Sequence, residues 1–174
     1  PIHVLSTMRD PSFISYLGIG RSDLRIDMRQ TNASGNSFRL AAARVADDPD
    51  VESFAATVTS TFALLGEGGE TERFTVETGD FTQFPLDYLE GRAPVARSEI
   101  ALSYLNAADW GKEIGDRLVL LAGDSAETLT VTGVYQDITN GGRTAKAMID
   151  PNEESIVALS LAVSLVPNVA PEEK

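Results

Sequence analysis

The chain contains no cysteine and a single histidine, His3. The lack of cysteine excludes a disulfide framework, a thiolate nucleophile and a zinc–thiolate site. A Ser/His/Asp arrangement needs a base that is held firmly beside its nucleophile, and a histidine this close to a chain end is a poor base. We therefore predict no catalytic residue, and a hydrolase is the least favoured class of function.

Basic residues are also few, because Lys and Arg total 14 against 26 Asp and Glu, for a net charge of −12. Binding to nucleic acid or to anionic lipid requires clustered cations, so the sequence argues against both. A solvated acidic surface is favoured over an acidic binding face. Asp47, Asp48 and Asp50 do not match a calcium loop, because Pro49 and Val51 break the alternation of oxygen ligands. We predict no metal site and no cofactor.

Long apolar runs are missing as well. The longest, Ile156–Val166, is about half of the ~20 residues that a membrane-spanning helix needs. The chain begins at Pro1, carries no signal peptide, and ends in Pro171–Lys174, which reads as the first turn of a helix. We expect a piece excised from a longer protein. Its 174 residues, 43% of them apolar, are enough to build a hydrophobic core without disulfides or structural metals.

The first third of the chain predicts a strand, a helix and a second strand. Polar and apolar residues alternate strictly in Asp23–Arg29, which predicts a strand with one buried face. Apolar residues then recur on one helical face between Phe38 and Val45, and period two returns in Val51–Leu65. About twenty residues separate the two strands, which is enough for a right-handed crossover to a parallel neighbour.

After the turn at Gly66–Thr71 the chain predicts short strands and tight turns. Ser103 should cap a short helix, Tyr104–Trp110, that Gly111 closes. A hairpin follows at 117–137. In the last strand, Ile156–Val166, large residues share one face and Ala and Ser the other. We expect it to be central in a sheet, with a helix packed on its small-residue face.

Several aromatic residues fall in the middle of the chain, and they have two interpretations. They would line a ligand groove or, as we favour, fill a small second core. Exposed and contiguous rings would favour binding, whereas buried rings would favour a role without direct capture. The candidates for contact with a partner or substrate are Phe81, Phe84 and Tyr88.

A series of short motifs in a fixed order resembles the MacB-like periplasmic core domain, the extracytoplasmic part of bacterial FtsX-like ABC transporter permeases. Ser22–Asp27, with Tyr16–Gly18 before it, is similar to the region that follows the first membrane helix in some of them. The resemblance spans roughly Tyr16 to Val166. The motifs are Leu89–Pro94, Ser98–Ser103, Ala107–Gly111, Ile114–Asp116, Leu118–Leu120 and Leu129–Tyr135.

The resemblance implies an α+β fold of two lobes within a single extracytoplasmic domain, residues 1–174. A βαβ-type, porter-like lobe would be built from both chain ends, residues 22–66 with 143–168. A mostly β lobe, residues 67–142, would be inserted between them. Gly91 and Pro94 would shape a loop, Glu99 would begin a strand, and Gly115–Asp116 would turn into the hairpin. These motif residues would be architectural.

The resemblance also implies a function outside the cell membrane and without enzymatic activity. The domain would lie between two membrane helices of a permease, and a cytoplasmic ABC ATPase subunit or domain would drive it. Its partners would be its flanking transmembrane helices and a second permease copy. The strands at 23–29 and 156–166 would act as levers with their ends side by side, transmitting ATP-driven motion. The alternative is an extracellular binding module that captures a peptide or partner protein.

Overall fold

The computed structural model describes residues 22–29 and 35–167. Three features discussed above, His3, Tyr16–Gly18 and Pro171–Lys174, lie outside the described residues. Within them the chain is mostly β, with 51% strand and 16% helix. The predicted α+β class with a βαβ-type lobe is therefore wrong.

The described strands all belong to one hydrogen-bonded sheet, which two α-helices and two 3-10 turns accompany. The strands are β1 (Leu24–Arg29), β2 (Val51–Leu65), β3 (Thr71–Gly79), β4 (Tyr88–Gly91), β5 (Glu99–Ser103), β6 (Arg117–Ala122), β7 (Ser125–Tyr135), β8 (Thr144–Ala147) and β9 (Ile156–Leu165). The helices are α3 (Gly35–Ala46) and α4 (Tyr104–Trp110), and the 3-10 turns are η1 (Thr139–Gly142) and η2 (Glu153–Ser155).

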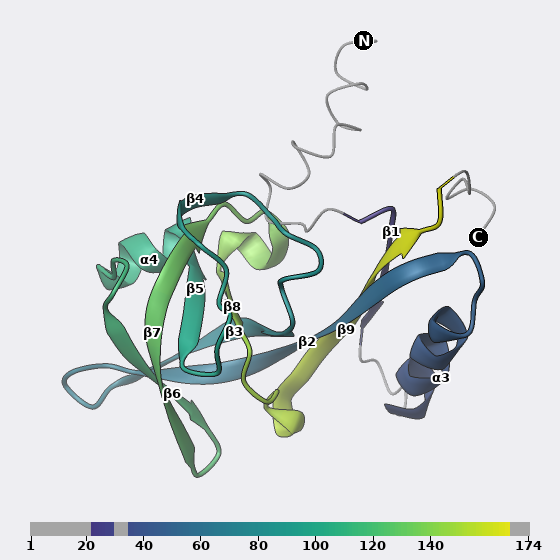
Figure 1. Cartoon of the computed structure of the whole chain (residues 1–174). Coiled ribbons are helices and arrows are strands. Elements are labelled where there is room, and N and C mark those ends of the chain that lie inside the picture. The colour runs from purple at the N-terminus through teal and green to yellow at the C-terminus, as the bar shows by residue number, and fades with distance from the viewer. Residues whose placement is uncertain (1–21, 30–34, 168–174) are drawn as a thin grey trace.

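Six of the strands close into a barrel, which occupies the left of Figure 1. Around it the pairing runs β2-β3-β8-β5-β7-β6 and returns from β6 to β2. The β3–β8 and β5–β7 pairs are parallel and the others antiparallel. Closure gives each barrel strand a partner on both edges, and the apolar side chains that alternate along every strand fill the inside.

The remaining strands form a three-stranded sheet in the order β1-β9-β2, with α3 on one face (Figure 1). Its core consists of Leu161, Val163 and Leu165 of β9, against which α3 packs. β2 belongs to both regions, because residues 51–60 pair with β9 and residues 63–65 pair with β6. The predicted division of the chain into lobes stays a prediction.

The crossover argument predicted that β1 and β2 are neighbouring parallel strands, but the two strands are not adjacent. β9 lies between them and is antiparallel to both. We expected a helix on the small-residue face of β9, but α3 covers the face that carries the large residues. Ala41, Ala42 and Val45 of α3 are small, so the large residues of β9 fill the space beneath the helix. The Ser160 and Ala162 face points instead toward the loop after β3.

Two local predictions in the motif region are confirmed. α4 runs from Tyr104 to Trp110, the Ser103 hydroxyl accepts a hydrogen bond from the Asn106 amide at 3.4 Å, and Gly111 ends the helix at φ 57°. Gly91 is required by its surroundings, since it has φ 69° and an added Cβ would lie 2.2 Å from the Thr132 carbonyl oxygen. These residues shape the backbone.

The two ends of the described part of the fold, in β1 and β9, lie side by side (Figure 1). The Asp23 amide donates to the Val163 carbonyl oxygen at 2.9 Å, and the Leu165 amide donates to the Asp23 carboxylate at 2.8 Å. Neither helix within residues 22–29 and 35–167 combines the length and the apolar character needed to cross a bilayer.

Candidate functional site

Three charged side chains meet where the three-stranded sheet joins the barrel. They are Arg25 of β1, Glu77 of β3 and Lys146 of β8, and we call them the junction cluster. Glu77 and Lys146 stand opposite each other in the parallel pairing of β3 with β8. Arg25 lies on the face of β1 that alternation turns away from the apolar core under α3. Strand register therefore brings the three groups together.

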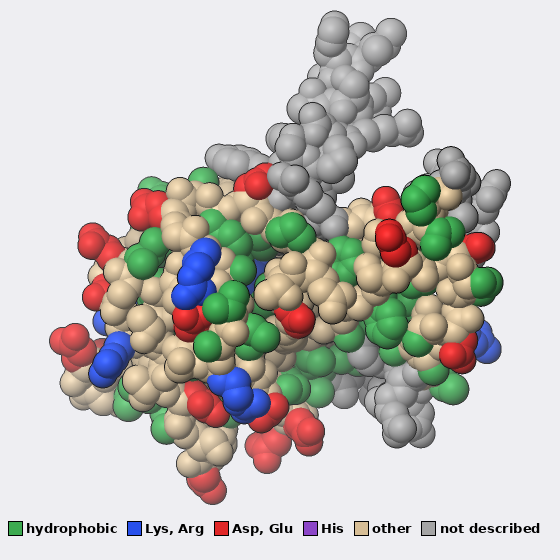
Figure 2. Space-filling view, in the orientation of Figure 1, with side chains coloured by type: hydrophobic (Ala, Val, Ile, Leu, Met, Phe, Trp, Pro, Cys, Tyr) green, Lys and Arg blue, Asp and Glu red, His purple; other side chains and the backbone are tan. Residues whose placement is uncertain are grey.

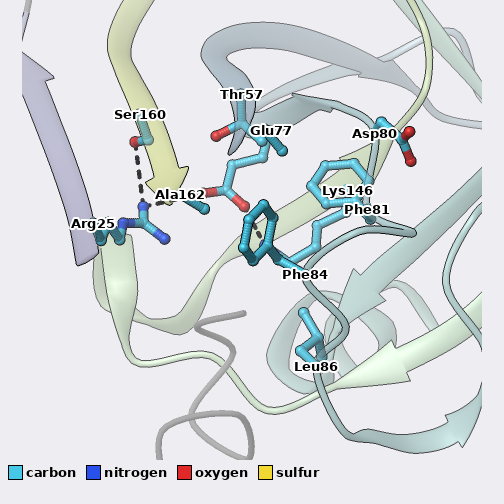
Figure 3. Close-up of a pocket in the computed structure, with 11 residues that line it drawn as sticks. Arg25, Thr57, Glu77, Asp80, Phe81, Phe84, Leu86, Lys146, Ser160 and Ala162 are labelled. Carbon is cyan, nitrogen blue, oxygen red and sulfur yellow. Dashed lines mark hydrogen bonds and ion pairs between the residues drawn. The ribbon is translucent and has the colours of Figure 1, made fainter. Parts of the chain in front are cut away.

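Within the junction cluster, Glu77 lies between the two cations (Figure 3). The Lys146 ammonium donates to Oε2 of Glu77, and Nη2 of Arg25 lies 3.5 Å from Oε1. The Lys146 ammonium also lies 5.3 Å from the ring centroid of Phe81 and 5.1 Å from that of Tyr135, within cation–π range. The side chains of Glu77 and Lys146 are only 10% and 6% exposed. A buried pair with this many partners holds its strands firmly.

Arg25 connects the cluster to the middle strand of the sheet. Its Nε donates to Oδ1 of Asp27 at 2.8 Å and its Nη2 to the Ser160 hydroxyl at 3.3 Å. The Ser160 hydroxyl donates in turn to Oδ1 of Asp27 at 2.6 Å. One arginine therefore joins β1, β9 and the barrel strand β3.

The electrostatics keep Glu77 and Arg25 ionised. Burial by itself would raise the pKa of Glu77, but the charges and hydrogen bonds of Lys146 and Arg25 outweigh it, and the pKa is lowered. Burial opposes the charge of Arg25 too, yet the carboxylates of Glu77 and Asp27 raise its pKa. A carboxylate saturated by two cations is a poor general base. The cluster is suited to holding strands together and not to proton transfer.

A cavity of about 40 Å³ adjoins the cluster, with Phe81, Phe84 and Leu86 among the residues that line it. It has room for a few water molecules. Pockets for small-molecule ligands usually measure about 300–1,000 Å³. The cavity is therefore far too small to hold a small-molecule substrate. Lys and Arg side chains on the face shown in Figure 2 lie apart from one another and form no basic patch there.

The aromatic residues singled out from the sequence surround this junction. Phe81 and Phe84 are 8% and 9% exposed. Tyr88 packs edge-on against Tyr135, with ring centroids 6.0 Å apart, and burial raises the pKa of Tyr88. Burial is the outcome under which a role without direct capture is favoured. Contact between these rings and a partner stays a prediction.

A second buried network, missed from the sequence, lies on the outer side of the barrel wall, next to the junction cluster. The Tyr135 and Thr144 hydroxyls are 2.7 Å apart, and the Thr144 hydroxyl donates to the Asp137 carboxylate. Asp137 also accepts from the amide of Thr139 at 2.7 Å, which fixes η1 against the barrel. No three His, Cys, Asp or Glu side chains in the described ranges are grouped so that they would hold a metal.

Sequence reasoning also missed the junction cluster, although one signal was present. Lys146 is the single charge in β8, a strand in which every residue is buried. A lone cation in such a strand calls for a buried anion, which β3 supplies.

No protein-family model and no curated protein sequence matches the chain. Several solved structures share its fold, among them the three described next. A domain of a putative permease protein from Porphyromonas gingivalis is 21% identical with a TM-score of 0.55, covering 76% of this chain and 63% of that one. The periplasmic region of MacB from Actinobacillus actinomycetemcomitans is 12% identical with a TM-score of 0.55, covering 97% and 83%.

The third is the extracellular domain of the noncanonic ABC-type transporter YknZ from Gram-positive bacteria, which is 13% identical with a TM-score of 0.50, covering 79% and 73%. The chain thus spans less than two thirds of the length of the first structure. At these identities the likeness concerns the fold. The expected resemblance to MacB-like periplasmic domains is confirmed at that level.

Proposed function

We propose that this chain, which has the fold found in extracytoplasmic domains of ABC transporter permeases, transmits ATP-driven motion outside the cell membrane. It would lie between two membrane helices of an FtsX-like permease and carry out no chemistry of its own. A cytoplasmic ABC ATPase subunit or domain would supply the energy, and a second permease copy would complete the assembly.

The observation that carries the proposal is the connection between the described chain ends and the barrel. A displacement applied at Asp23 and Leu165 acts on β1 and β9, which are paired along their length. From β9 it reaches β2 through their shared ladder, and from β1 it reaches β3 through Arg25 and Glu77. A domain that is loaded at two adjacent ends and joined to its barrel by two connections suits the transmission of motion.

The cavity at the junction is too small for a small-molecule substrate, which supports a structural role for the junction itself. The saturated carboxylate of Glu77 supports it as well, because a catalytic acid or base needs a free proton position.

The test uses the full-length permease with its ATPase in membranes. Hydrogen exchange of β1 and β9 amides is compared between the nucleotide-free and ATP-bound states. We expect the protection of these strands to change with nucleotide, while the barrel amides stay protected. Equal exchange in both states would contradict transmission through this domain.

Two variants sharpen this test. Leu161→Pro removes a ladder hydrogen bond from the central strand β9 and should abolish ATP-dependent activity, whereas Leu161→Val should retain it. Arg25→Gln keeps the strands and cuts the tie to Glu77, so it should weaken coupling without lowering ATP hydrolysis by the ATPase. Normal ATP-dependent activity of a transporter that carries Leu161→Pro would contradict the proposal.

A further inference from the structure

Within the described residues, the chain passes between the barrel and the three-stranded sheet at two places. One is β2, which belongs to both regions. The other is the segment 148–155, which leads from β8 of the barrel to β9 of the sheet and ends in η2, the short turn at the start of β9 in Figure 1. The two passages meet where Asn152 and Ser155 contact the backbone of Thr61 in β2, and we call these two side chains the strap.

The strap contacts β2 between two of its strand partners. On this edge β9 pairs with β2 as far as Ser60, and β6 pairs with β2 from Ala63 onward. No described strand pairs with Thr61 there, although β3 pairs with the other edge of β2 from residue 57 to residue 65 without a break. A backbone amide and carbonyl left unpaired in such a gap would cost free energy unless other groups bonded them.

The strap supplies the bonds that a strand would otherwise supply. The Ser155 hydroxyl accepts a hydrogen bond from the Thr61 amide at 3.2 Å and donates one to the Thr61 carbonyl oxygen at 2.7 Å. The side-chain amide of Asn152 donates to the same carbonyl oxygen at 2.7 Å, and its backbone amide donates to the Ser60 hydroxyl at 3.0 Å. Since Ile156, the first residue of β9, follows Ser155 directly, these bonds fix the start of β9 to the barrel wall.

The strap is the weakest of three connections between the two regions. The β2–β9 ladder extends from residue 51 to residue 60 of β2, and the contact of Arg25 with Glu77 involves a buried carboxylate. The strap consists of part-buried bonds between polar side chains and one backbone position, which water replaces at a small cost in free energy. A register shift between Thr59 and Ser60 also interrupts the β2–β9 ladder beside it.

We propose that the strap holds the three-stranded sheet and the barrel in one orientation, and that it is the first of the three connections to release when β9 is displaced. It adds a third connection to the two described above, and its role in a transporter rests on the proposed function. The strap itself is tested in the 174-residue chain without nucleotide or membrane, so its failure and that of the proposed function are distinguishable.

The first test is hydrogen exchange measured residue by residue. Ser155→Ala removes the acceptor of the Thr61 amide, whose exchange should become about tenfold faster, while the amides of Thr59 and Ala63 should keep their rates. Ser155→Thr retains the hydroxyl and should restore the protection. Glu154→Ala, an exposed position in the same turn, is the control and should change nothing. Unchanged exchange at Thr61 in Ser155→Ala, or an equal increase at all three amides, would overturn the proposal.

The second test reads the orientation of the two regions. The chain has no cysteine, so thiols introduced as Arg44→Cys on α3 and Asp124→Cys in the turn between β6 and β7 would carry spin labels at two defined, exposed positions. Asn152→Ala combined with Ser155→Ala should broaden the distribution of distances between the labels in double electron–electron resonance. Glu154→Ala should leave the distribution unchanged. Equally narrow distributions in both backgrounds would show that the strap does not set the orientation.

Discussion

The barrel and the three-stranded sheet are built from one hydrogen-bonded sheet, but they are stabilised to different degrees. The barrel is closed, and buried apolar side chains line the inside of every one of its strands. Within the described residues, β1 has a strand partner on one side only, one helix covers the apolar face of the sheet, and the buried residues of the core under that helix come from β9. The described ends of the fold, in β1 and β9, therefore belong to the region with the smaller apolar core.

Regions with fewer buried contacts open at lower free energy than a closed core. We therefore expect β1, β9 and α3 to move or open while the barrel stays intact.

Removing the Glu77 carboxylate, which contacts Arg25 of the three-stranded sheet and Lys146 of the barrel, should have the largest effect on stability. Glu77→Gln leaves the buried Lys146 ammonium without its carboxylate and should cost about 3–5 kcal/mol, read by urea unfolding at pH 7. Glu77→Gln with Lys146→Met removes both charges and should recover much of that loss. A single variant as stable as the original chain would show that the cluster does not hold the regions together.

The ion pair of Glu77 with Lys146 should also make the stability of the fold sensitive to acid. Because the pKa of Glu77 is lowered in the folded state, its stabilisation is present above the ordinary pKa of 4.5 and is lost as pH falls below that value. Urea unfolding between pH 6 and pH 2 should show a smaller loss in Glu77→Gln than in the original chain. Parallel curves would contradict the assignment.

A matched pair of cavity variants compares the two cores. Ile100→Ala in β5 should cost about 2–5 kcal/mol and lower the protection of the whole molecule. Leu161→Ala in β9 removes an equally buried side chain, but it should open β1 and β9 locally while barrel amides remain protected. Hydrogen exchange measured residue by residue distinguishes these outcomes. The same set of exposed amides in both variants would mean that the regions are not separate units of stability.

Backbone strain at the barrel wall should come next in size. Gly91→Ala forces a positive φ and drives Cβ against the Thr132 carbonyl oxygen, at a cost of about 1–3 kcal/mol in thermal or urea unfolding. Gly123→Ala is the control, since φ there is 56° but nothing lies within 4 Å of the added Cβ. Equal losses would mean that conformation alone, and not the close approach to β7, requires Gly91.

The smallest effect concerns a loop beside the barrel. Arg92 pairs with Glu99 at 2.6 Å, and this hydrogen bond with that from the Val95 amide lowers the pKa of Glu99 to about 2. Glu99→Gln should cost no more than about 1 kcal/mol at pH 7. The loss should vanish as pH falls from 4.5 toward 2, because the original carboxylate is then protonated too. Chemical denaturation across that range checks it.

Local features of the fold could be predicted because their signals are local. Ser103 and Gly111 bound α4 as their chemistry indicates, and the hairpin of β6 and β7 follows from the turn at Gly123. Nothing comparable indicates that β9 pairs with β1, more than a hundred residues earlier in the chain. Alternation determines which face of a strand is buried but does not specify its neighbour. Closure of the barrel rests on a short pairing of β2 with β6, residues 63–65 with 119–121, which no periodic pattern announces.

In the candidate site, too, local features could be predicted and contacts between distant strands could not. Phe81 and Phe84 are marked by their ring chemistry, and they are buried beside the cavity at the junction. Arg25, Glu77 and Lys146 come from three separate strands, so their meeting depends on sheet register. Arg25 and Glu77 each look like an ordinary surface charge when read alone.

The length of β2 has a mechanical consequence. This strand pairs with β9 in its first part and with β6 at its end, and it passes between the two regions as a continuous strand. A rotation imposed on its first part would therefore reach the barrel as twist along this strand, beside the connection from Arg25 to Glu77. β2 would then act as a torsion element, so that a small rotation of the three-stranded sheet turns the barrel with it.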